Sequence, residues 1–164
     1  MALDGKVALI TGAGSGFGKA TSLLFAKNGA KVVAVDLNLE AAKAVVEEIE
    51  GAGGSALALK ADVSSEDEVK SVIDRAVEEF GQLDILFNNA GTYVHGNVEE
   101  TSTDGWHKSV EVNLSSVFYG VKHAIPHLKK TKGNIISTAS AGGVIGFPSA
   151  VAYAATKGGV ISLT

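Results

Sequence analysis

The sequence predicts an α/β fold in which helices cover both faces of a doubly wound parallel sheet. Three observations support this prediction. Short runs rich in β-branched residues alternate with longer segments of helical periodicity along the 164 residues. The strand runs are almost continuously apolar, which is typical of parallel strands buried on both faces. The chain has 20 glycines but only 2 prolines, which indicates an ordered chain with tight turns.

Strands and helices are expected in alternating order. The strands cover residues 6–11, 31–36, 56–63, 83–91 and 134–140, and the helices cover residues 18–27, 39–50, 65–80, 103–129 and a last segment that begins near 149. The third helix has clear end signals, because Ser65 and Glu68 form a capping-box pattern and Gly81 fits the C′ position. Right-handed crossovers would place the carboxyl ends of all strands at one edge, where such sheets bind ligands.

The composition limits the classes of function. The net charge is -4, so no basic surface for nucleic acid or an anionic membrane is expected. The chain has no cysteine, which excludes disulfides, thiolate catalysis and thiolate metal sites. The first apolar run, Val7 to Ile10, is too short for a signal peptide or a membrane span. With 46% hydrophobic residues the chain can form one core, and we expect one cytoplasmic domain over residues 1–164.

A glycine-rich turn, TGAGSGFG, follows the first strand and opens a helix. Its glycines Gly12, Gly16 and Gly18 would let the backbone turn sharply and let a pyrophosphate approach the main chain at a helix N-terminus. Ser15 and Phe17 lie in the same turn. Such a turn can also be purely structural, so its interpretation depends on the residues that follow.

Asp36 ends the second predicted strand at the offset from the turn expected for an acid that holds an adenosine ribose. A carboxylate there accepts hydrogen bonds from a 2′-hydroxyl and repels a 2′-phosphate. Neither Ser15 nor Leu37 offers the positive charge that a phosphorylated ribose requires. The sequence therefore favours NAD over NADP. The alternative is that Asp36 is only a polar residue that ends the strand and promotes solubility.

Further motifs follow in order: Asp62 with Val63, then NNAG from Asn88 to Gly91. Together with the glycine turn, they resemble the classical short-chain dehydrogenase/reductase family over nearly the whole chain. In that family the first pair contacts adenine, and NNAG supports the sheet and lines the adenosine pocket. The resemblance implies a Rossmann-like fold whose cofactor site comprises Gly12, Ser15, Gly16, Phe17, Gly18, Asp36, Asp62, Val63, Asn89, Ala90, Gly91, Tyr153 and Lys157.

The same resemblance implies a catalytic set of Asn113, Ser140, Tyr153 and Lys157. Tyr153 and Lys157 are four residues apart and share one helix face, although such a pair alone is more often a surface pair. A tyrosine would exchange the proton of the substrate oxygen, and a lysine cation beside it would stabilise the phenolate, since the ordinary tyrosine pKa is near 10. Lys157 would also bond the nicotinamide ribose, Ser140 would hold the substrate oxygen, and Asn113 would anchor a water in a proton relay.

These residues predict an NAD-dependent oxidoreductase that transfers a hydride between the nicotinamide cofactor and a small-molecule secondary alcohol or ketone, such as a sugar, a polyol, a steroid or an acyl thioester. The alternatives are a dinucleotide-binding fragment or module without turnover, and an NADP-dependent carbonyl reductase. Members of the family often form tetramers through the long helix and the last helix, so a homo-oligomer, dimer or tetramer, is expected. The family continues into two more strands and a loop over the substrate. We therefore expect this chain to be part of a longer enzyme, truncated after the fifth strand and part of the following helix.

Three further features are assigned no catalytic role. His123 and His127 have the i, i+4 spacing of helical zinc ligands, but no third ligand accompanies them, so a subunit or solvent face is expected. His95 lies in a loop at the ligand edge and could contact substrate. The loop AGGVIGFPSA would either line the substrate pocket or close the core with its apolar side chains, Val144, Ile145 and Phe147.

Overall fold

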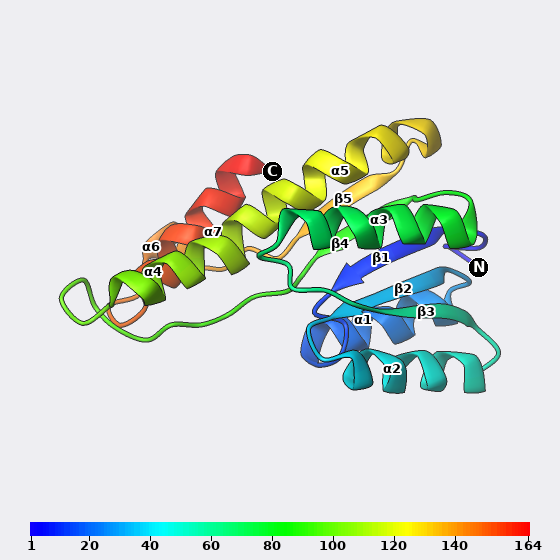
Figure 1. Cartoon of the computed structure of the whole chain (residues 1–164), viewed down its shortest axis with the longest axis horizontal. Helices are drawn as coiled ribbons and strands as arrows, with labels where there is room; N and C mark the ends of the chain where they lie inside the picture. Colours follow the sequence, from blue (N-terminus) through cyan, green and yellow to red (C-terminus); the bar gives the residue numbers. More distant parts are fainter.

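The computed structural model describes residues 1–164 and contains one five-stranded sheet flanked by helices (Figure 1). The strands are β1 (Val7–Thr11), β2 (Lys31–Asp36), β3 (Ser55–Lys60), β4 (Ile85–Asn88) and β5 (Asn134–Ser137). Their order is β3-β2-β1-β4-β5, and every neighbouring pair is parallel. The chain thus winds outward from β1 in both directions. This confirms the predicted doubly wound α/β fold, with the third to fifth strands shorter than predicted at their carboxyl ends.

The helices are α1 (Gly16–Lys27), α2 (Leu39–Gly51), α3 (Glu66–Phe80), α4 (Thr103–Val110), η1 (Glu111–Ser115), α5 (Ser116–Thr131), α6 (Gly142–Ile145) and α7 (Val151–Leu163). The first helix begins two residues earlier than predicted, and the last begins at Val151 rather than near 149. The predicted long helix runs from α4 through α5 but contains a π-helical turn, η1, and the short α6 was also not predicted. None of these helices has the length and apolar character needed to cross a membrane.

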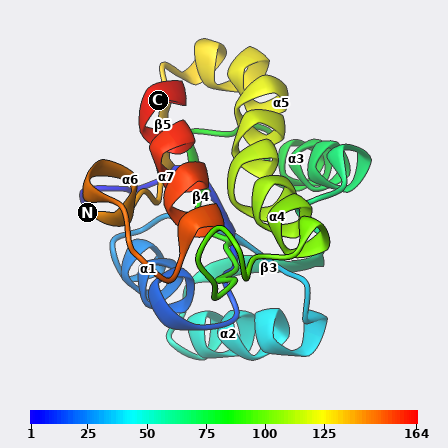
Figure 2. The same ribbon diagram turned by 90° about the vertical axis from the view of Figure 1, so that its left-hand side faces the viewer.

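Helices lie on both faces of the sheet (Figure 1, Figure 2), and the hydrophobic core forms one layer on each face. On one face, β1 and β2 residues such as Leu9 and Val35 pack against α3 and α5. On the other face, Ile10 and Val32 pack against α1 and α2. Successive strand residues point to opposite faces, so a strand between two helical layers is expected to be apolar at nearly every position. This accounts for β1, whose five residues are all buried.

The two edge strands are less buried than the sequence predicts. The inner residues of β3 are only half-buried, and Ile136 in β5 is 43% exposed. Both strands have a neighbour on one side only, so their outer sides remain open to solvent. The prediction of burial on both faces is confirmed for β1 and β2 and is wrong for β3, whereas β5, the last strand of this chain, is partly exposed because no strand covers its outer side here.

Helix α3 begins and ends at its predicted signals, with one difference. The Ser65 hydroxyl accepts the Glu68 N–H at 3.4 Å, and Gly81 adopts the left-handed conformation with its N–H on the Val77 carbonyl. In a complete capping box the Glu68 carboxylate would accept from the Ser65 N–H. It accepts instead from the Asp62 N–H at 2.8 Å, and so fixes the helix to the end of the loop that follows β3.

A buried carboxylate fixes the amino ends of β1 and β4. Asp84 is 2% exposed and accepts hydrogen bonds from the Val7 N–H at 2.9 Å, the Lys6 ammonium at 2.8 Å and the Gln82 amide at 2.6 Å. Burial by itself would raise the pKa of Asp84, but the bonds from Lys6, Val7 and Gln82 outweigh it and hold this pKa below its usual value. The ionised form is therefore the one that joins the strands.

Replacing this carboxylate should destabilise the protein in a pH-dependent way. Asp84→Asn is expected to lower the free energy of unfolding at pH 7 by about 1–3 kcal/mol, because one partner of a buried charged network is lost. Since the folded-state pKa is lowered, the stabilisation is present above the ordinary aspartate pKa and is lost as the pH falls through the folded-state value. Urea unfolding should show the wild type approaching the variant in acid. Glu78→Gln, in an exposed pair with Arg75, is the matched control, and equal midpoints for Asp84→Asn and wild type at pH 7 would contradict this account.

Candidate cofactor and catalytic site

Most of the predicted cofactor residues line one cavity at the carboxyl edge of the sheet. The cavity has a volume of about 490 Å³, and the turn after β1, the end of β2 and the loops after β3 and β4 form its walls. These walls include Gly12, Ser15, Gly16, Phe17, Asp36, Asp62, Val63, Asn89, Ala90 and Gly91. The parallel strands bring these residues together from distant parts of the sequence, as the resemblance implies.

A larger cavity, of about 780 Å³, lies at the opposite edge of the sheet. It is bounded by the first residues of the chain and by the carboxyl ends of α1 and α2. None of the predicted site residues lines it. Because doubly wound sheets bind ligands at the carboxyl ends of their strands, we take the smaller cavity as the candidate site.

The glycine turn after β1 packs tightly against the start of α1. A Cβ on Gly18 would collide with the carbonyl oxygen of Gly12, and Gly12 itself has a φ of +64°. Ser15 precedes α1 without capping it by its side chain, and the first turn of the helix contains no acidic residue. The first N–H groups of α1 are therefore available to an anion, and the turn fits a pyrophosphate.

Asp36 lies on the cavity wall between the glycine turn and α2. One carboxylate oxygen accepts the Gly14 N–H at 2.9 Å, and the other accepts the Asn38 N–H at 2.9 Å. These two bonds fix the orientation of the carboxylate. Each oxygen retains capacity to accept another hydrogen bond, so the side chain can bind ribose hydroxyls.

The residues that close the cavity are fixed by hydrogen bonds within their loop or to the sheet. The Asp62 carboxylate accepts from the Ser64 hydroxyl and the Ser64 N–H, and these bonds lower the pKa of Asp62 although burial opposes them. The N–H groups of Asn89 and Ala90 both donate to the Thr11 hydroxyl, and the Asn89 amide donates to the Thr11 carbonyl at 3.0 Å. The NNAG motif thus ties the end of β4 to the end of β1, which is the support of the sheet that the resemblance implies.

Asn113 lies fully buried in the middle of the π-helical turn η1. Its amide donates to the Thr92 carbonyl at 2.9 Å and to the Thr156 hydroxyl at 3.3 Å, while its oxygen accepts the Thr92 N–H at 2.7 Å. One side chain therefore joins the segment after β4 to α7. A single wide turn leaves no periodic signal in the sequence, so the sequence predicts a helix here but not the π turn.

Tyr153 and Lys157 lie one turn apart on α7. The Lys157 ammonium is 5.7 Å from the centre of the Tyr153 ring and donates to the Thr138 carbonyl at 2.6 Å. Lys157 is only 4% exposed, and this burial lowers its pKa. The alternative of a surface pair is therefore wrong for these two residues. Two of the three N–H donors of Lys157 remain available to a ligand.

Ser140 follows β5, and the segment that it begins packs on α7. The Ser140 hydroxyl oxygen accepts the Gly142 N–H at 3.1 Å, so its O–H group is free to donate. Gly143 approaches the backbone of Lys157 and Gly158 so closely that a side chain there would collide with it. This packing brings Ser140 to the same edge of the sheet as the tyrosine and lysine.

Two residues beside the site, Tyr93 and Thr138, were not predicted from the sequence. The Tyr93 ring lies 4.9 Å from the Tyr153 ring, and Thr138 accepts the hydrogen bond of Lys157. Tyr93 follows β4 and Thr138 follows β5, and both strands end at the site. This position after a strand is the only sequence feature that could have identified them.

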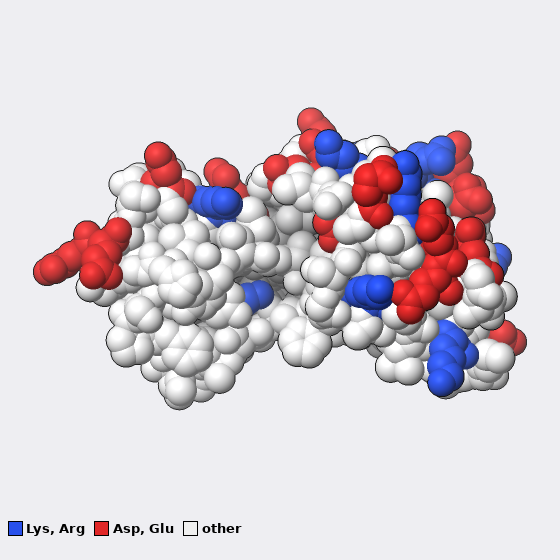
Figure 3. Space-filling model, turned by 90° about the horizontal axis from the view of Figure 1, so that it is seen from below, with Lys and Arg blue, Asp and Glu red and all other residues white.

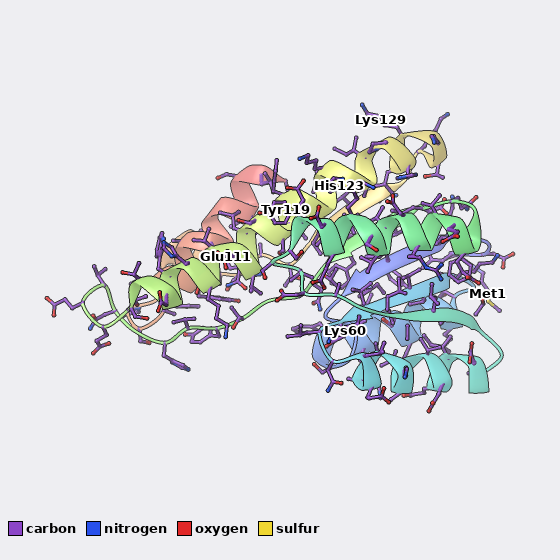
Figure 4. All side chains as sticks on the ribbon, in the orientation of Figure 1. Met1, Lys60, Glu111, Tyr119, His123 and Lys129 are labelled. Atoms are coloured by element: carbon purple, nitrogen blue, oxygen red, sulfur yellow. The ribbon has the colours of Figure 1, made fainter.

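The features left outside the site have structural explanations. A ring nitrogen of His123 on α5 lies 2.9 Å from a Glu66 carboxylate oxygen, which also accepts from the Lys122 ammonium, so His123 joins α5 to α3 (Figure 4). No group of three or more metal-ligating side chains is gathered anywhere in the structure. Val144 and Ile145 are 76% and 77% exposed, so the alternative that they close the core is wrong.

Comparison with known proteins agrees with this arrangement. A model of the short chain dehydrogenase family matches residues 6–164. The chain is 46% identical over 163 residues to a cyclohexanol dehydrogenase from Acinetobacter sp. (strain SE19), covering 98% of this chain and 65% of the relative. It is 42% identical over 164 residues to a meso-2,3-butanediol dehydrogenase from Serratia marcescens, covering 100% of this chain and 64% of the relative.

A solved structure gives the same result. A crystal structure of a short chain dehydrogenase/reductase from Burkholderia phymatum, in complex with NAD, superposes with a TM-score of 0.96 at 38% sequence identity. The match covers 99% of this chain and 59% of that one, so the chain spans about two thirds or less of the length of these proteins. The strand order, the glycine turn and the family match lead to one conclusion: the chain belongs to the short-chain dehydrogenase/reductase family of oxidoreductases.

Proposed function

We propose that this chain carries the cofactor site and the acid/base residues of an NAD-dependent dehydrogenase that oxidises secondary alcohols to ketones. The observation that carries the proposal is the buried Lys157 ammonium beside the Tyr153 ring, next to a cavity lined by the glycine turn and Asp36. The named relatives support the substrate class, because cyclohexanol, 2,3-butanediol and 3β-hydroxysteroids all carry a secondary hydroxyl.

Each part of the cofactor has a residue of suitable chemistry in the cavity or, for Lys157, beside the cavity wall at Gly91. The N–H groups at the start of α1 would bind the pyrophosphate, and Asp36 would accept from the adenosine ribose. The two free N–H donors of Lys157 would bond the hydroxyls of the nicotinamide ribose. A 2′-phosphate would bring negative charge to Asp36, which supports a preference for NAD over NADP.

Oxidation of the alcohol removes a hydride from carbon and a proton from oxygen. Bound NAD⁺ would supply the hydride acceptor. The Tyr153 oxygen would take the proton, and the adjacent Lys157 charge would stabilise the resulting phenolate. The free O–H of Ser140 would donate to the substrate oxygen and hold it near the Tyr153 oxygen.

The proton would leave through the space between Lys157 and Asn113. A Cβ on Gly91 would lie 3.2 Å from the Asn113 amide oxygen and 4.0 Å from the Lys157 ammonium, so the glycine leaves this space free. The Asn113 oxygen already accepts the Thr92 N–H and retains one further lone pair for a water. A water placed between the Asn113 oxygen and the Lys157 ammonium would complete the relay.

Homo-oligomer formation would use helices α5 and α7. Phe118 on α5 and Ile161 and Leu163 on α7 are exposed apolar side chains, and a shallow groove of Leu114, Ser115, Phe118, Tyr119, Gly159, Ser162 and Leu163 lies between the helices. Burying this face against a second copy would remove apolar surface from water.

Turnover should depend on Tyr153 more strongly than cofactor binding does. In the full-length protein encoded by its gene, Tyr153→Phe is expected to lower kcat for alcohol oxidation by about 10²–10⁴-fold, because the proton acceptor is lost. NADH affinity, followed by cofactor fluorescence, should change little. Tyr119→Phe is the control. Full turnover in Tyr153→Phe would disprove the assignment, and NADH binding by the wild type without oxidation of any alcohol would favour a binding module.

Asp36 should set the choice between the two cofactors. We expect the wild type to bind NADH at least about tenfold more tightly than NADPH, and Asp36→Asn to reduce this ratio several-fold by removing the charge while keeping an acceptor. Titrations of fluorescence and of thermal unfolding with both cofactors would measure the ratio. Asp74→Asn on α3 is the control, and an unchanged ratio in Asp36→Asn would contradict the role given to Asp36.

A further inference from the structure

Three aromatic rings form a row beside the proposed proton acceptor. The Tyr93 ring lies 4.9 Å from the Tyr153 ring at an angle of 47°. The His95 ring lies 4.6 Å from the Tyr93 ring, at 68°, in an edge-on arrangement. Aromatic pairs prefer such tilted and edge-on geometries, so the row is a favourable packing unit.

The segment that carries Tyr93 and His95 is held at both ends. At one end, the Asn113 side chain bonds both the N–H and the carbonyl of Thr92. At the other end, the Gly96 N–H donates to the Ser149 carbonyl at 2.8 Å, and the Gly96 carbonyl accepts from the Val151 N–H at 3.3 Å. The second attachment lies at the start of α7, the helix that carries Tyr153. The backbone that carries Tyr93 is therefore held in place relative to α7.

Tyr93 is nevertheless 45% exposed. Its contact with Tyr153 leaves much of its surface uncovered, and an exposed aromatic surface at a site is suited to an apolar ligand. Figure 3 shows that the side chains of Lys, Arg, Asp and Glu are denser on the half of the molecule with α1 and α2 than on the half with α4, α6 and α7.

We propose that Tyr93, supported by His95, is a specificity-determining residue that selects alicyclic secondary alcohols. The substrate ring would lie on the exposed part of the Tyr93 side chain while its hydroxyl reaches Tyr153. A six-membered ring has a broad, rigid face that covers an aromatic ring, whereas an open chain of the same carbon number covers less of it and loses more conformational freedom on binding. This inference rests on the proposed function and adds to it the class of alcohol.

Binding can be tested without turnover, because the chain has three tyrosines, Tyr93, Tyr119 and Tyr153. With ¹³C-labelled tyrosine rings and NADH present, cyclohexanol should shift the NMR signals of Tyr93 and Tyr153 and leave that of Tyr119 unchanged. Tyr→Phe variants assign the three signals. A Tyr93 signal that does not respond to saturating cyclohexanol would overturn the proposal. A response in a protein that oxidises no alcohol would support the contact and refute the proposed function instead.

The selection of alicyclic over open-chain alcohols is tested by comparing kcat/KM for cyclohexanol and for 2-hexanol in the full-length protein encoded by its gene. Tyr93→Ala should lower the ratio of the two values by about tenfold or more, and Tyr93→Phe should restore it, because the phenyl ring keeps the contact surface. Val98→Ala, an exposed apolar residue in the same loop, is the control and should leave the ratio unchanged. If Tyr93→Ala lowers both values equally, or neither, the proposal is wrong.

Discussion

The geometry of the site depends on one buried amide. Asn113 bonds both polar backbone groups of Thr92 and reaches the Thr156 hydroxyl on α7. Three parts of the chain that are far apart in sequence therefore meet at one side chain: the segment after β4, the π-helical turn and the helix with Tyr153. A buried amide that loses these partners carries the full cost of desolvation, so the three parts keep their relative positions together or lose them together. The wide turn of η1 is the local distortion that accompanies this arrangement.

Lys157 on α7 differs from Asn113 because its burial costs folding stability. Lys157 is buried with a single hydrogen bond, to Thr138, and burial lowers its pKa because the charged form is poorly solvated. A cation in this position costs folding free energy that a surface lysine would not cost. The cost is understandable if the charge serves a ligand, since the same poor solvation strengthens its attraction for a phenolate or a ribose hydroxyl.

Sequence reasoning succeeded where a local rule and the global fold agree. The apolar runs predicted β1 and β2, and the glycine turn and Asp36 were predicted to share one edge, which the cavity confirms. It failed for the burial of β3, because the burial of an edge strand depends on neighbours that its own residues do not specify. It also missed the π turn at Asn113 and the ring of Tyr93, because both depend on contacts between segments far apart in the chain. The roles of Tyr153 and Ser140 in the reaction remain predictions of the sequence motif, supported by where the structure places them.

The position of β1 and β4 inside the sheet has a consequence for local stability. Each of these strands is hydrogen-bonded to a neighbour on both sides, so their amide hydrogens are expected to exchange with solvent only when much of the sheet opens. The glycine turn follows β1 directly, and the NNAG motif at the end of β4 is bonded to Thr11 at the end of β1. We therefore expect the backbone around the cavity to be among the slowest-exchanging parts of the molecule and to keep its shape during local fluctuations elsewhere.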